Sequence, residues 1–127
     1  MLKLIDTGIE NTIGFSIEGK ITKEDMSLVL SAVKEKGEQH PHLFLYEEIE
    51  SIGGLEFRAM LEKLSFLWET GFSNIRKIAI VSDKRWVHTV VDIEDRIFRG
   101  IQMKSFDRQN KQAALAFLQQ RDERASS

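Results

Sequence analysis

The sequence predicts an α/β fold: a mixed sheet of four or five strands, parallel at its centre and covered by helices. Three observations predict it. Segments with strand-like apolar patterns take turns with segments whose apolar residues recur every three to four positions. Their order, β-β-α-β-α-β-α-β-α, favours right-handed crossovers between parallel strands. A length of 127 residues suits one domain of this kind and is short for two.

The N-terminal third predicts a hairpin followed by a helix. Residues 2–5 form a short apolar stretch, and apolar residues alternate with small or polar ones over 13–17, which predicts two antiparallel strands. Thr22 can cap a helix whose first turn is acidic. Apolar residues at helical spacing follow over 26–33, and Gly37 is the expected end.

The middle of the chain predicts two buried strands on either side of a helix. Residues 43–46 are apolar on both faces, as in a central parallel strand. A polar, glycine-bearing connection follows, and the apolar residues of 57–68 then fall on one helical stripe. Residues 78–81 predict the second buried strand.

The last third predicts a helix, a strand and a final helix. Asp83 can cap a helix that ends at Gly100, and residues 101–106 predict the last strand. Asp107 is the expected cap of the final helix. We expect residues 1–120 to form one domain and the polar residues 121–127 a frayed tail.

The composition excludes several classes of protein. No cysteine is present, so a disulfide scaffold, a zinc finger and a thiol nucleophile are excluded. The apolar runs fall far short of the roughly 20 residues of a membrane helix. Asp6 and Glu10 stand where a signal peptide would be apolar. We therefore expect a soluble, cytoplasmic, bacterial-type protein with no transmembrane segment.

The charge is close to balanced overall and uneven along the chain. The formal net charge is −2 and the isoelectric point about 5.9, which argues against a nucleic-acid partner. Residues 1–50 hold 5 basic and 10 acidic residues, and residues 51–127 hold 13 and 10. These charges either cover different helix faces or form a mildly basic surface for an acidic partner.

The histidines suggest weak candidates for chemistry. His40 and His42 flank a proline and could chelate a metal, but no third ligand stands nearby. His88 precedes Asp92 by one helical turn and could be oriented by it for base chemistry, although a surface hydrogen bond explains the spacing as well. We expect no metal and no cofactor.

Three glutamates crowd the end of the first buried strand. Glu47, Glu48 and Glu50 could perform acid–base chemistry or bind a cation, because sites form at strand ends in this architecture. A solvated loop is the simpler interpretation. An enzyme that uses these carboxylates with His88 is the weakest of our three functional hypotheses, and no catalytic residue is assigned.

Two loops at predicted strand ends are the candidate ligand or partner surface. Ser51, Gly53 and Gly54 precede a helix, where glycines permit close approach and free amides attract anions. A tight turn with a cap would use the same residues. Neither a Walker-type loop nor a dinucleotide-binding fingerprint is present.

The second loop follows the strand over 78–81. Asp83, Arg85 and Trp86 combine a capping carboxylate, a cation and an indole at one helix start. Tryptophan and arginine are enriched in binding hot spots, which favours a rim for an anionic or planar ligand, or for a protein. The alternative is a cap with Trp86 folded onto the sheet.

Three segments resemble the SpoIIAA-like family of small bacterial domains, relatives of the STAS domains. They are residues 18–25 (EGKITKED), residues 77–86 (KIAIVSDKRW), and residues 104–107 (KSFD) with the alanine-rich helix that follows. The resemblance covers roughly residues 1–120. It implies a SpoIIAA/STAS-like βαβ sandwich with a mostly parallel sheet, related in shape to CRAL-TRIO lipid-binding domains.

The resemblance also implies a candidate phosphorylation site. Anti-sigma-factor antagonists carry Asp-Ser-Ser/Thr-Gly at a strand-to-helix loop, where a kinase modifies a serine. The matching stretch here is Glu50-Ser51-Ile52-Gly53, so Ser51 is the candidate hydroxyl. The motif's aspartate and second hydroxyl are missing, and the neighbouring glutamates would repel a phosphate.

Two functions follow as expectations. The first is a non-enzymatic regulatory or protein-interaction module that resembles the antagonists, with a protein partner or a second copy of itself. The alternative is a carrier or sensor of a small hydrophobic or anionic ligand, admitted between the helix predicted over 57–68 and the helix predicted between Asp83 and Gly100.

Overall fold

The computed structural model describes residues 1–51, 53, 57–60, 62, 74–97 and 100–120. The predicted element order is confirmed over these residues. Residues 57–60 and 62 are helical, and the rest of the helix predicted over 57–68 lies outside them. The elements are β1 (Leu2–Ile5), β2 (Thr12–Glu18), α1 (Lys23–Gly37), β3 (Leu43–Ser51), β4 (Ile75–Val81), α3 (Arg85–Ile97), β5 (Gln102–Phe106), the 3₁₀ helix η1 (Arg108–Asn110) and α4 (Lys111–Gln119).

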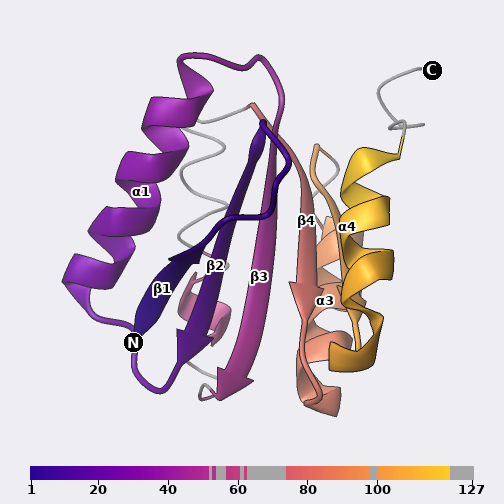
Figure 1. The fold of residues 1–127 in the computed structure, drawn as a ribbon. Coiled ribbons are helices and arrows are strands. Elements are labelled where there is room, and N and C mark those ends of the chain that lie inside the picture. The colour runs from indigo at the N-terminus through magenta and orange to yellow at the C-terminus, as the bar shows by residue number, and fades with distance from the viewer. Residues whose placement is uncertain (52, 54–56, 61, 63–73, 98–99, 121–127) are drawn as a thin grey trace.

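The five strands form one mixed sheet in the order β1-β2-β3-β4-β5 (Figure 1). β1 pairs antiparallel with β2, and the four strands β2 to β5 pair in parallel. The predicted hairpin and parallel centre are therefore confirmed. The carboxyl ends of β2 to β5 meet at one edge of the sheet, called the carboxyl edge below, and their amino ends meet at the opposite edge.

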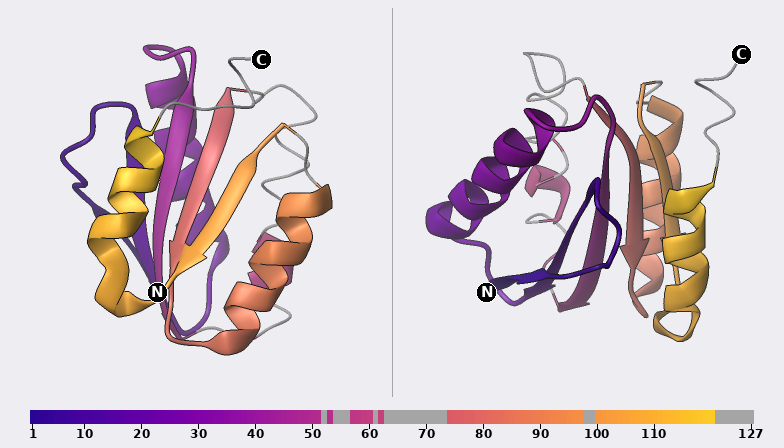
Figure 2. Two further views of the ribbon diagram at one scale, coloured as in Figure 1. Left: turned by 90° about the vertical axis from the view of Figure 1, so that its right-hand side faces the viewer. Right: turned by 45° about the horizontal axis from the view of Figure 1, so that its top comes forward.

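Helices cover both faces of the sheet (Figure 2). Every second residue along the strands points to the face that packs against α1, residues 57–60 and α3. On the other face, α4 covers β3, β4 and β5. The alternation along β3 explains both layers, because Leu43 and Leu45 face the first core and Tyr46 the second. The first core includes Phe15, Ile17, Val29, Val33, Ile49, Ile78, Ile80, Val87 and Val91.

The predicted start of α1 is confirmed as a capping box. The Thr22 hydroxyl accepts a hydrogen bond from the Asp25 amide at 3.1 Å, and the Asp25 carboxylate accepts one from the Thr22 amide at 3.0 Å. The bond from the Thr22 amide to the carboxylate is the main cause that lowers the pKa of Asp25, because it favours the charged form. α1 ends at Gly37, as the sequence predicts.

Gly14 lets the hairpin close tightly. A Cβ at this position would lie 2.7 Å from the carbonyl oxygen of Ile5 and 2.6 Å from the Cγ2 atom of Thr7. Moving the backbone of the neighbouring strand costs stability, so any side chain at position 14 would displace β1 and destabilise the hairpin.

The predicted cap of the final helix is wrong. η1 follows Asp107 first, and Asn110 is the N-cap residue of α4. The Asp107 carboxylate makes no cap hydrogen bond, and instead lies 3.2 Å from His88 Nε2. The local sequence predicts that the Asp107 carboxylate caps the helix, but in the structure it contacts His88. The spacing of these two residues along the chain does not reveal this contact.

None of the helices in the described part of the chain is long and apolar enough to span a bilayer.

Candidate functional site at the carboxyl edge

The topology places the two predicted loops side by side. β3 and β4 are hydrogen-bonded neighbours and parallel, so the residues after Ser51 and those after Val81 leave the sheet at the same edge. Ser51 is the last residue of β3, and Gly53 is exposed just beyond it. Gly54 lies outside the described residues.

An aromatic contact joins the two loops. The Gly53 carbonyl accepts a hydrogen bond from the Phe57 amide at 3.0 Å, which starts the helical turn over 57–60. The Phe57 ring meets the Trp86 ring edge to face, with 5.6 Å between the ring centroids. Phe57 is fully buried and Trp86 half-buried, so Trp86 anchors the start of α3 while keeping one side accessible.

Asp83 ties the same loop to the end of β5. Its Oδ1 atom accepts a hydrogen bond from the Arg108 amide at 3.2 Å. The buried Ser82 hydroxyl accepts one from the Lys84 amide at 3.1 Å and tightens the turn before α3. These bonds fix the backbone on which the next residue, Arg85, is presented.

Arg85 is the first residue of α3 and is exposed. The charged ion pairs between described residues are formed by Arg108 and Lys111, and the Arg85 guanidinium takes part in neither of them. A planar cation with five donors therefore faces solvent between Asp83 and Trp86.

Glu48 and Glu50, expected in a solvated loop or an acidic cluster, lie within β3 and are paired. Glu50 Oε1 lies 2.9 Å from an Arg108 guanidinium nitrogen. Glu48 accepts a hydrogen bond from the Tyr46 hydroxyl at 2.8 Å and lies 3.3 Å from Lys111 Nζ. Burial and the bond to Glu48 raise the pKa of Tyr46. The cations come from η1 and α4, about sixty residues away, so spacing along the chain could not reveal them.

Glu47 faces the opposite side of the sheet. It is fully buried, and within the described structure neither carboxyl oxygen has a hydrogen-bond partner. Burial raises its pKa to about 8, so the group is mainly a neutral acid at pH 7. The three glutamates therefore do not form one cluster, which removes the geometric basis for using them together with His88.

The histidines are engaged elsewhere. His42 Nδ1 accepts a hydrogen bond from Arg76 Nε at 3.1 Å, and the His40 carbonyl accepts one from the Asn74 side chain. His88 pairs with Asp107 rather than with the residue one turn along its helix. Among the described residues, no group of three or more metal-ligating side chains comes together.

A five-stranded mixed sheet with helices on both faces and loops gathered at its carboxyl edge defines a STAS-like α/β domain. A model of the SpoIIAA-like family matches residues 12–119, and the chain belongs to the SpoIIAA-like family. The resemblance stated from the sequence is thus confirmed.

A solved structure shares the fold. It is an uncharacterised protein of the DUF3478 family from Shewanella loihica PV-4, which has a SpoIIAA-like fold. The two chains are 15% identical, with a TM-score of 0.64 over 93% of this chain and 92% of that one. No curated protein sequence matches this chain.

Proposed function

We propose that this chain is a non-enzymatic regulatory or protein-interaction domain that binds its partner at the carboxyl edge. The exposed guanidinium of Arg85, which forms no ion pair with any described residue, carries the proposal together with the half-buried Trp86 ring beside it. Arginine and tryptophan dominate binding hot spots because they bury much area and place directional donors. The complementary partner surface presents a carboxylate or another anion to Arg85.

The platform around Arg85 is preorganised. Asp83 is held by the Arg108 amide, and Trp86 by the Phe57 ring. Binding therefore orders few additional side chains, which lowers its entropic cost. Together with Ser51, Gly53 and Gly54, these loops form the proposed partner surface.

Ser51 remains the candidate modification site within that surface. Lys111 and Arg108 pair with Glu48 and Glu50, which reduces the negative charge that a phosphate on Ser51 would meet. The repulsion between these glutamates and a phosphate on Ser51 is therefore weaker than the number of glutamates in the sequence suggests.

Affinity enrichment from the native host with a matched charge-reversal control tests the proposal. The wild-type chain is compared with Arg85→Glu and with Lys34→Glu, an exposed position near the end of α1. Specific partners should be reduced about tenfold or more by Arg85→Glu, since hot-spot losses exceed about 2 kcal/mol, and retained by Lys34→Glu. Equal recovery with both variants would contradict the proposal.

One observation favours the alternative, a carrier or sensor of a small hydrophobic or anionic ligand. Such a ligand would lie between the sheet and the helical residues 57–60 and 85–97. The Glu47 acid lies on that face, and its carboxyl oxygens find no hydrogen-bond partner among the residues that the structure describes. A buried polar group left unsatisfied costs about 1–3 kcal/mol. A ligand oxygen would accept a hydrogen bond from the protonated Glu47 carboxyl.

Mass spectrometry of protein from the native host, under native and then denaturing conditions, distinguishes the carrier from the interaction domain. Mass lost on denaturation would favour the carrier, and a bare chain the interaction domain.

A further inference from the structure

We infer that the outer side of β1 binds a second copy of this chain, so that two sheets join through antiparallel β1 strands. β1 is the end strand of the sheet, and within the described structure no strand pairs with its outer side. A bare edge strand presents unpaired backbone donors and acceptors, which another strand satisfies. This surface is separate from the carboxyl edge, so the inference does not rest on the proposed function.

The register of the hairpin shows which backbone groups of β1 point outward. The Met1 carbonyl accepts a hydrogen bond from the Glu18 amide at 2.9 Å, and the next pair along the ladder is Leu2 with Ile17. Hydrogen-bonded and non-hydrogen-bonded pairs alternate in an antiparallel ladder. The amides and carbonyls of Leu2 and Leu4 therefore point away from β2.

Leu4 is the more accessible of these two residues. The Leu2 amide already interacts with the Asp25 carboxylate at the start of α1, and the Leu2 side chain is buried in the first core. Leu4 is 50% exposed. On the opposite end strand, the Met103 amide of β5 donates to the Asp95 carboxylate at 2.8 Å. Leu4 is thus the point at which a strand can be added.

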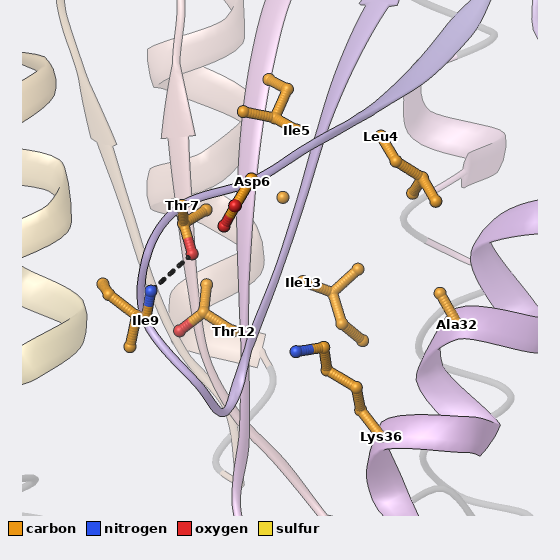
Figure 3. Close-up of a pocket in the computed structure, with 10 residues that line it drawn as sticks. Leu4, Ile5, Asp6, Thr7, Ile9, Thr12, Ile13, Ala32 and Lys36 are labelled. Carbon is orange, nitrogen blue, oxygen red and sulfur yellow. Dashed lines mark hydrogen bonds between the residues drawn. The ribbon is translucent and has the colours of Figure 1, made fainter.

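Apolar side chains surround Leu4 on one face of the sheet. Side chains alternate along a strand, so Leu4 shares the face of Leu2, which α1 covers. Leu4 and Ala32 of α1 lie on the same side of the hairpin and line one open pocket (Figure 3). Leu28, one turn before Ala32, is 41% exposed. A second copy would cover apolar surface that the fold leaves in water.

Charge and hydrogen bonding select the register of the pair. A twofold axis through Lys3 would place two exposed lysines opposite each other, and like charges in that position destabilise a strand pair. It would also pair Leu4 with Leu2, whose amide is already engaged. An axis through Leu4 avoids both costs, because Leu4 then meets Leu4 of the second copy and Lys3 lies opposite Ile5. The same surface serves both copies, so the contact closes as a dimer.

Sedimentation velocity of the full chain, from about 10 µM to about 1 mM, tests the dimer, because an interface this small gives weak association. The wild type should shift from monomer toward dimer over this range. Leu4→Lys, which places a charge on the edge, should raise the dimer Kd about tenfold or more. Ile93→Lys is the matched control, since Ile93 of α3 is 42% exposed, and should leave the Kd unchanged.

Cysteine crosslinking tests the register. The chain has no cysteine, so Leu4→Cys supplies the only thiol. An axis through Leu4 brings the two Cα atoms to about 5.5 Å, within the range of a disulfide. Leu4→Cys should therefore oxidise to a linked dimer faster than Lys3→Cys, and Ile93→Cys should be the slowest.

Four outcomes would overturn the inference. The first three are a chain that stays monomeric over the whole range, equal weakening of the dimer by Leu4→Lys and Ile93→Lys, and crosslinking at position 93 as fast as at position 4. The fourth is a monomer that binds lipid vesicles through Leu4, which would assign the patch to a membrane surface. Arg85→Glu should leave the dimer unchanged, so this inference and the proposed function can fail separately.

Discussion

At the scale of single residues, Glu47 is the least compensated group in the described structure. Its strand neighbours across the ladder are Phe15 and Ile80, both fully buried. A charge there would be desolvated without a counter-charge, so the carboxyl stays protonated to about pH 8. The residue is therefore a hydrogen-bond donor in an apolar layer rather than a carboxylate.

Glu47 should make stability fall as pH rises from about 5 to 8. The unfolded chain releases the proton near the ordinary pKa of 4.5, whereas the folded chain keeps it to about 8. Between these values the folded state binds more protons, so the free energy of unfolding decreases with pH, by at most about 1.4 kcal/mol per pH unit.

Urea unfolding at four pH values, for the wild type and Glu47→Gln, measures this contribution. The difference between the two curves isolates Glu47 from the other carboxyl groups. The variant should be the less pH-sensitive protein and gain relative stability toward pH 8. Parallel curves would show that Glu47 is not buried as a neutral acid.

At the scale of elements, a single buried lysine secures α4. Lys77 Nζ donates to the Phe117 carbonyl at 3.0 Å and to the Gln120 carbonyl, at the end of the helix where the dipole is negative. The cation also lies 5.5 Å and 5.3 Å from the centroids of the Phe44 and Phe117 rings. β4 thus holds the helix that covers this face.

Lys77→Met should detach the end of α4. The substitution keeps the apolar stem and removes the donors, so we expect a loss of about 2 kcal/mol in the free energy of unfolding. Amide hydrogen exchange should quicken most in α4. Lys111→Met is the matched control, because its partly exposed pair with Glu48 contributes under about 1 kcal/mol. Equal losses for both variants would contradict this role for Lys77.

At the scale of the whole molecule, periodicity was sufficient to predict the sheet and its helices. The alternation of apolar and polar residues predicted β2, and the capping pattern at Thr22 predicted the start of α1. Both patterns depend only on residues that are close in sequence. Side chains alternate between the two faces of a strand, so the sequence could also have predicted that Glu47 shares a face with Leu45 and Ile49 of the first core. The candidate loops lie at one edge because parallel pairing brings strand ends together.

Interactions across the sheet were beyond sequence reasoning. The cations of Arg108 and Lys111 reach the glutamates of β3 only because α4 folds back over that strand. His88 finds Asp107 because β5 returns beside α3. These contacts depend on crossover geometry, which residue spacing does not encode.

The measurement that tests the central claim most directly is site-specific photocrosslinking in the native host. A photoreactive amino acid replaces Lys84, the exposed neighbour of Arg85 at the carboxyl edge, in one chain and Lys34 near the end of α1 in another, both exposed. The account predicts a discrete crosslinked protein from the first position and none from the second. The same product from both positions, or from position 34 alone, would contradict a partner surface at the carboxyl edge.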